Sequence, residues 1–181
     1  MADLISLAQD IGFSHAARLN AKTLVVRGEV RDMCASGRCQ RYGHSWSCPP
    51  ACGSLEHISK LLSSYTGGVL VQATTVMDGD FDAEAIERAQ KKHKEDFATL
   101  ARQARLLHPD CLPLTAGTCT LCNRCTYPDR PCRYPAKRLS SMEAFGLLVR
   151  DVCRDAGLPY YYGPGTLTFS SCILTREDEK A

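Results

Sequence analysis

Four cysteines in the second half of the chain have the spacing of iron–sulfur ligands. Cys119, Cys122, Cys125 and Cys132 follow the pattern C-x2-C-x2-C-x6-C, with Pro135 shortly after. A [4Fe–4S] cluster is held by four thiolates, and three cysteines at successive x2 spacing let one tight loop reach three irons. A more distant cysteine then supplies the fourth. Ferredoxins use an x3 spacer before that cysteine, so Cys132 is the ligand that departs from their pattern.

Zinc is the main alternative at this loop. Structural zinc sites usually take two separated C-x2-C pairs, and a cysteine triplet leaves one thiolate surplus for a tetrahedral ion. The pattern therefore favours one [4Fe–4S] cluster as the cofactor, with zinc as the alternative.

A second group of cysteines lies upstream, at Cys34, Cys39, Cys48 and Cys52, with Pro49 and Pro50 between the last two. Three or four thiolates on one irregular loop favour a second metal site. Cys52 closes the site or is a small buried residue, and His44 is an alternative ligand. If only three protein ligands bind, one iron stays open to a small molecule, which is a feature of an enzyme rather than a carrier.

Cysteine content and charge limit the classes of function. The 181 residues include 11 cysteines, an odd number that cannot pair completely in disulfides. Dense cysteines in a reducing compartment indicate metal, and the N-terminus lacks the features of a signal peptide, so we expect a cytoplasmic location. A formal charge of +2 gives no argument for nucleic acid. No apolar run is long enough for a membrane span.

The elements that must position these cysteines are predicted from periodicity and caps. Helices are predicted over 3–11, over 55–64 with Ser54 as cap, and from Asp82 to about residue 108. Strands are predicted from 24 to about 30, over 69–76 and over 167–174. A capping box of Ser140 and Glu143 predicts a further helix to about residue 156, ended by Gly157.

The two cysteine-rich loops, 34–53 and 111–138, lie between these regular elements. We therefore expect a single domain over 1–181 with an α/β or α+β fold. Its mixed sheet would be flanked by helices, and the two metal-binding loops would meet at one end of the core. Cys111, Cys153 and Cys172 are predicted to be small core residues.

Several motifs together carry a family resemblance. They are Cys34-x4-Cys39-x2-Tyr42-Gly43-x2-Trp46-x-Cys48-Pro49-Pro50, Gly117-x-Cys119-x2-Cys122-x2-Cys125, Pro131-Cys132-Arg133-x-Pro135 and Ser141-Met142-Glu143-Ala144. From about Ile11 to Leu174 the chain resembles the predicted metal-binding proteins called domain of unknown function 2284. The resemblance implies metal binding, with iron–sulfur chemistry, at Cys34, Cys39, Cys48 and the four downstream cysteines. It implies no reaction and does not require Cys52.

Three hypotheses of function follow. The first is an electron-transfer protein with one or two [4Fe–4S] clusters and a redox partner protein. The second is a redox or desulfuration-type enzyme with an open iron at the upstream site. The third is a binding module stapled by zinc. No phosphate-binding glycine loop, GxSxG elbow or HExxH helix favours another chemistry.

Overall fold

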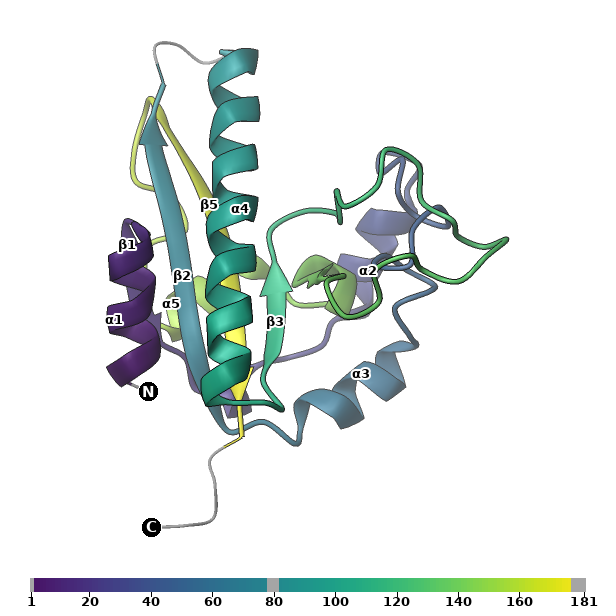
Figure 1. Ribbon diagram of the computed structural model, residues 1–181, viewed down its shortest axis with the longest axis horizontal. Coiled ribbons are helices and arrows are strands. Elements are labelled where there is room, and N and C mark those ends of the chain that lie inside the picture. The colour runs from purple at the N-terminus through teal and green to yellow at the C-terminus, as the bar shows by residue number, and fades with distance from the viewer. Residues whose placement is uncertain (1, 78–81, 177–181) are drawn as a thin grey trace.

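A mixed sheet with helices on both faces forms the body of the molecule (Figure 1). The computed structural model describes residues 2–77 and 82–176. In chain order the elements are α1 (Ala2–Ile11), β1 (His15–Arg18), the 3-10 helix η1 (Ala21–Thr23), α2 (Gly28–Ala35), α3 (Leu55–Leu62), β2 (Gly67–Val76), α4 (Ala83–Leu107), β3 (Leu112–Thr115), β4 (Ser140–Ser141), the 3-10 helix η2 (Glu143–Phe145), α5 (Val149–Asp155) and β5 (Thr166–Thr175).

The sheet has the strand order β1-β2-β5-β3-β4. β5 is its centre and pairs antiparallel with β2 along the full length of both strands. Only β3 and β4 run parallel, with Leu114 opposite Ser140. The chain is thus an α+β protein with a mixed sheet flanked by helices, as the sequence predicts.

Successive side chains along each strand point to opposite faces of the sheet. Both faces are buried because helices pack against each of them. Val69, Val71 and Ile173 point to the face covered by α1 and α4, where Phe97 and Leu100 are fully buried. The opposite face packs against α3, η2 and α5, with these residues at its centre: Leu70, Cys172, Leu174, Ile58, Leu62, Phe145, Val152 and Cys153. Cys153 and Cys172 are therefore core residues, as predicted, and Cys111 packs half-buried at the edge of the first face.

Most of the predicted elements are confirmed. The helices over 3–11, 55–64 and 82–108 form within two residues of their predicted bounds, and so do the strands over 69–76 and 167–174. Ser54 caps α3 by accepting a hydrogen bond from the amide of His57, at 3.1 Å. The described residues contain no helix with the length and apolar character that crossing a membrane requires.

The strand predicted from 24 to about 30 is wrong. Val26 makes only an isolated bridge with Leu147, and Gly28–Ala35 is the helix α2. β-branched residues at 25 and 26 gave a local strand signal, but no neighbouring strand extends the pairing. The strand β1 was missed, because its sequence His-Ala-Ala-Arg has little strand propensity and it forms by pairing with Val69–Gln72 of β2.

The capping box at Ser140 is also wrong. Ser140 pairs with β3 as part of β4, and Ser141 instead accepts the hydrogen bond from the amide of Ala144, at 3.1 Å. A 3-10 turn follows, and α5 begins only at Val149. Pairing with the sheet takes Ser140 out of reach of a helix start, whereas the predicted end at Gly157, with a φ of 73°, is confirmed.

Two long segments leave this body on the side of β3 (Figure 1). Residues 36–54 connect α2 to α3, and residues 116–139 connect β3 to β4. They correspond to most of the two cysteine-rich loops, and they are largely without regular structure, as predicted.

Candidate metal centre

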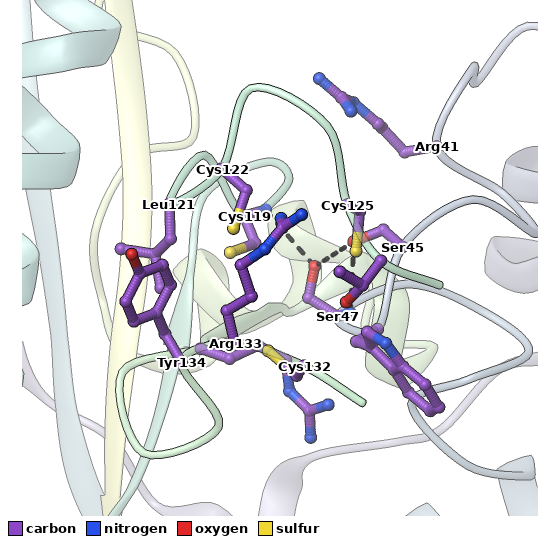
Figure 2. Close-up of a pocket in the computed structure, with 13 residues that line it drawn as sticks. Arg41, Ser45, Ser47, Cys119, Leu121, Cys122, Cys125, Cys132, Arg133 and Tyr134 are labelled. Carbon is purple, nitrogen blue, oxygen red and sulfur yellow. Dashed lines mark hydrogen bonds between the residues drawn. The ribbon is translucent and has the colours of Figure 1, made fainter. Parts of the chain in front are cut away.

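The four downstream cysteines line one pocket. Figure 2 shows Cys119, Cys122, Cys125 and Cys132 around it. The remaining lining residues include Leu121, Arg133 and Tyr134 from the same loop. The structure therefore gathers all four side chains that spacing alone grouped together.

Local hydrogen bonds bring Cys132 back to the triplet across its long spacer. The Thr126 hydroxyl donates to the carbonyl of Pro131 at 2.9 Å, and the Arg133 guanidinium donates to the carbonyl of Arg124 at 2.9 Å. Each bond closes a turn between the triplet and the segment that carries Cys132. The x6 spacer is thus folded back on itself.

The upstream loop supplies the other wall of the same pocket, through Arg41, Ser45, Trp46 and Ser47. The Trp46 indole N–H donates to the carbonyl of Arg130 at 3.0 Å, and its ring meets Tyr127 edge to face at 4.9 Å between centroids. The prediction that the two loops meet is confirmed. The edge-to-face ring contact and the indole hydrogen bond join the two loops.

Hydrogen-bond donors converge on Cys125. Burial, the largest single cause, raises the pKa of this thiol. Hydrogen bonds from the Ser45 side chain and from the backbone of Tyr127, Trp46 and Thr126 together outweigh burial, so the net effect is a lowered pKa. Donors aimed at a sulfur favour the thiolate, which is the form that binds a metal or a cluster. Trp46 and Ser45 belong to the upstream loop, so the donor set depends on contact between the loops.

A buried hydroxyl pair lies between the two groups of cysteines. Ser45 and Ser47 are almost fully buried, and their oxygens are 3.0 Å apart. The Ser47 oxygen lies 3.7 Å from the sulfur of Cys48 and accepts a hydrogen bond from the amide of Cys119 at 3.4 Å. One serine thus contacts a member of each group.

Lys94 brings a positive charge to the same place from α4. Its Nζ donates to the carbonyl of Thr118 at 2.6 Å. Burial lowers the pKa of Lys94, while the negative charges of Cys119 and Cys48 act in the opposite direction. An ammonium this close to both cysteine groups offsets part of the negative charge of a thiolate site.

The upstream cysteines are close enough to influence one another. Cys34 lies in the last turn of α2 and Cys48 is buried. Burial is the main cause that raises the pKa of Cys34, followed by the charges of Cys39, Glu143 and Cys48. Burial also raises the pKa of Cys48, with Cys39 contributing. His44, the alternative ligand, is exposed.

Cys52 differs from the other three. Its thiol donates to the carbonyl of Ala144 at 3.4 Å and accepts a contact from Nη2 of Arg31 at 3.5 Å. Burial raises its pKa, which favours the protonated thiol that this donation requires. Arg31 also donates to the carbonyls of Ala144 and Gly53, at 2.7 and 2.9 Å, and so fixes this end of the loop.

No three Cys, His, Asp or Glu side chains within residues 2–77 and 82–176 converge to hold one metal ion. A tetrahedral zinc ion needs its donors about 2.1–2.3 Å from a single point. The downstream cysteines instead surround a pocket. Four thiols around one pocket are a donor set that suits a cubane cluster, in which each thiolate binds a different iron, and also a zinc ion with four cysteine ligands.

Sequence patterns did not identify several residues of this site. Lys94 lies in the middle of the long helix predicted from Asp82, Ser47 is one of many serines, and Arg31 directly follows the segment that was wrongly predicted to be a strand. Their roles arise from contacts over long sequence separations. A basic residue or hydroxyl next to a cysteine loop is too common a feature to be found by pattern.

The fold and the site define a cysteine-rich α+β protein with two thiol-bearing loops in contact. The family model described as predicted metal-binding protein, domain of unknown function 2284, matches residues 17–175, and the chain belongs to this family. No curated protein matches the chain. Among solved structures, epoxyqueuosine reductase from Bacillus subtilis is similar at 15% identity and a TM-score of 0.46, over 98% of this chain and 45% of that one. This chain thus spans less than half the length of that enzyme.

Proposed function

We propose that this protein transfers electrons through a [4Fe–4S] cluster held by Cys119, Cys122, Cys125 and Cys132. The observation that carries the proposal is the single pocket lined by all four cysteines. The hydrogen-bond donors around Cys125 support it, because donors of this kind stabilise a cluster and raise its reduction potential.

The upstream cysteines are proposed to hold a second cluster. Cys34, Cys39 and Cys48 influence one another electrostatically, as a set of nearby thiolates would. Ser47 contacts both the sulfur of Cys48 and the amide of Cys119, so one side chain bridges the two groups of cysteines. Clusters this close would exchange electrons with each other and with a redox partner protein.

A second candidate function is an enzyme with an open iron at the upstream site. The observation that favours it is the hydrogen bond of Cys52 to the carbonyl of Ala144. A thiol engaged as a donor is protonated and is not a metal ligand. An iron without a fourth cysteine could act as a Lewis acid or sulfur acceptor, in a redox or desulfuration-type reaction.

The experiment is to measure iron, zinc and acid-labile sulfide in protein purified without oxygen. About eight irons and eight sulfides per chain are expected for two cubane clusters, and about four of each for the downstream cluster alone. Zinc without sulfide would contradict the proposal and leave a zinc-stapled binding module. Chemical reduction followed by electron paramagnetic resonance then tests the carrier function, since a reduced [4Fe–4S] cluster is paramagnetic and zinc is not.

A further inference from the structure

Within the described residues, one carboxylate oxygen of η2, which packs against the helix that carries Cys34, is buried without a hydrogen-bond partner. Oε2 of Glu143 is inaccessible to solvent and makes no hydrogen bond with any residue in 2–77 or 82–176. Burying an anionic oxygen without a donor is unfavourable, and native proteins seldom do so without a reason. A bound cation or metal cluster is one such reason.

The position of Glu143 connects it to the upstream site. η2, which Glu143 begins, packs against α2, which carries Cys34. Arg31 of α2 fixes this contact by donating Nε to the carbonyl of Ala144, at 2.7 Å. The charge of Glu143 is one of the causes that raise the pKa of the Cys34 thiol, after burial and the charge of Cys39.

Cys52 is less suited to be the fourth ligand. Its sulfur is occupied by the donation to Ala144 and by the contact with Arg31. To bind iron it would have to lose its proton and this hydrogen bond. Oε2 of Glu143, by contrast, has no hydrogen bond within the described residues that ligation would break.

We propose that the carboxylate of Glu143, rather than the thiolate of Cys52, is the fourth protein ligand of the upstream site. The inference rests on the proposed function. The donor set is then Cys34, Cys39, Cys48 and Glu143. Its charge equals that of four thiolates, since one carboxylate replaces one thiolate. Carboxylate oxygen is a harder and weaker ligand for this iron than sulfur, so the iron it holds exchanges more readily with an incoming small molecule.

Substitutions of each group, purified without oxygen, test the assignment. Glu143→Gln removes the anionic donor at nearly constant volume and should yield about seven irons in place of about eight, with the signal of a [3Fe–4S] cluster in paramagnetic resonance. Glu143→Cys should restore the eighth iron, because it returns a thiolate. Cys52→Ala should keep all eight. Glu56→Gln, an exposed glutamate on α3, is the matched control.

The outcomes separate this inference from the proposed function. Cys34→Ala should lose about four irons, as the loss of one cluster requires. If it loses none, the second cluster does not exist and the Glu143 assignment fails with it. If Cys34→Ala loses four but Glu143→Gln keeps full iron and an unchanged spectrum, only the Glu143 assignment is wrong. Any loss of iron in Cys52→Ala also overturns it. Glu143→Cys distinguishes the loss of a ligand from misfolding. If the carboxylate had only a structural role, a thiol in its place would not restore the eighth iron.

Discussion

The Ser47 side-chain oxygen accepts a hydrogen bond from the backbone amide of Cys119, at 3.4 Å, across 72 positions of the sequence. The same oxygen lies 3.7 Å from the sulfur of Cys48. A residue of the upstream loop thus supports the start of the downstream triplet and contacts a cysteine of its own loop. This contact places the two groups of cysteines side by side.

Replacing Ser47 should change the reduction potentials of the sites without removing them. Ser47→Ala deletes a hydroxyl near the Cys48 sulfur, and fewer donors to a ligating sulfur make the potential more negative. We expect a negative shift in a redox titration followed by paramagnetic resonance, with unchanged iron content. Ser47→Thr should stay close to wild type, and so should Ser36→Ala, whose exposed hydroxyl donates to the carbonyl of Met33. An unchanged potential in Ser47→Ala would contradict the contact's role.

Cys132 is expected to be needed for the downstream cluster despite its long spacer. Cys132→Ala should lower the iron content, by about one iron if a [3Fe–4S] cluster is retained and by about four irons and four sulfides if the cluster is lost. Cys111→Ala is the control, since this half-buried cysteine packs against the α1–α4 side of the sheet and lines no part of the pocket. Full iron content in Cys132→Ala would remove this residue from the ligand set.

Cys125 should be a more reactive thiol than Cys34 in metal-free protein. Donors to its sulfur lower the pKa of Cys125, while burial and neighbouring charges raise the pKa of Cys34. The thiolate is the nucleophile, so iodoacetamide at neutral pH should label Cys125 first, as read by mass spectrometry of peptides. In denaturant both should react alike. Ser45→Ala should slow labelling of Cys125, and also of Cys48, whose pKa a hydrogen bond from Ser45 lowers, but not of Cys34. Equal rates for Cys125 and Cys34 in the folded protein would refute this account.

The buried His93 should make the protein less stable in acid. Burial lowers the pKa of His93 to about 4, from a model-peptide value of 6.5. Its unfolded form therefore binds a proton that the folded form excludes. The stability is fully present above about pH 6.5 and is lost as the pH falls towards 4, by up to about 3 kcal/mol.

Denaturant unfolding of metal-free protein at a series of pH values measures this loss. The apolar variant His93→Leu should lower stability at neutral pH, because it breaks the 2.7 Å bond to Ser171, but should flatten the slope between pH 6.5 and 4. His57→Gln, at an exposed position, should keep the wild-type slope. A wild-type slope in His93→Leu would assign the effect to another group.

Gly68 should be irreplaceable for packing reasons. A Cβ at this position would lie 2.3 Å from the carbonyl oxygen of Ile173 on the paired strand β5. Neither backbone can move without breaking the ladder, so Gly68→Ala should cost about 1–3 kcal/mol or more in the free energy of unfolding. Gly28→Ala, where a Cβ meets nothing within 4 Å, should be neutral or slightly stabilising in α2. Equal stability of the two variants would contradict this reading.

The sequence alone determined the features that depend on local pattern. Periodicity and caps located α1, α3, α4, β2 and β5, because an amphipathic helix or a buried strand repeats its signal over many residues. Spacing grouped Cys119, Cys122, Cys125 and Cys132, which the structure places around one pocket. The placement of the two cysteine-rich loops between regular elements also predicted that the loops meet at one end of the core.

Only the tertiary structure decided the features that depend on a distant partner. β1 forms through its pairing with β2, and Ser140 joins the sheet because β3 lies beside it, whatever their local propensities. Ser47 and Lys94 contact segments far away in the chain, and Glu143 lies where η2 packs against the distant helix α2. A hydroxyl, an ammonium or a carboxylate acts on a sulfur only over a few ångströms, and that distance is set by packing, which no spacing of residues along the chain records.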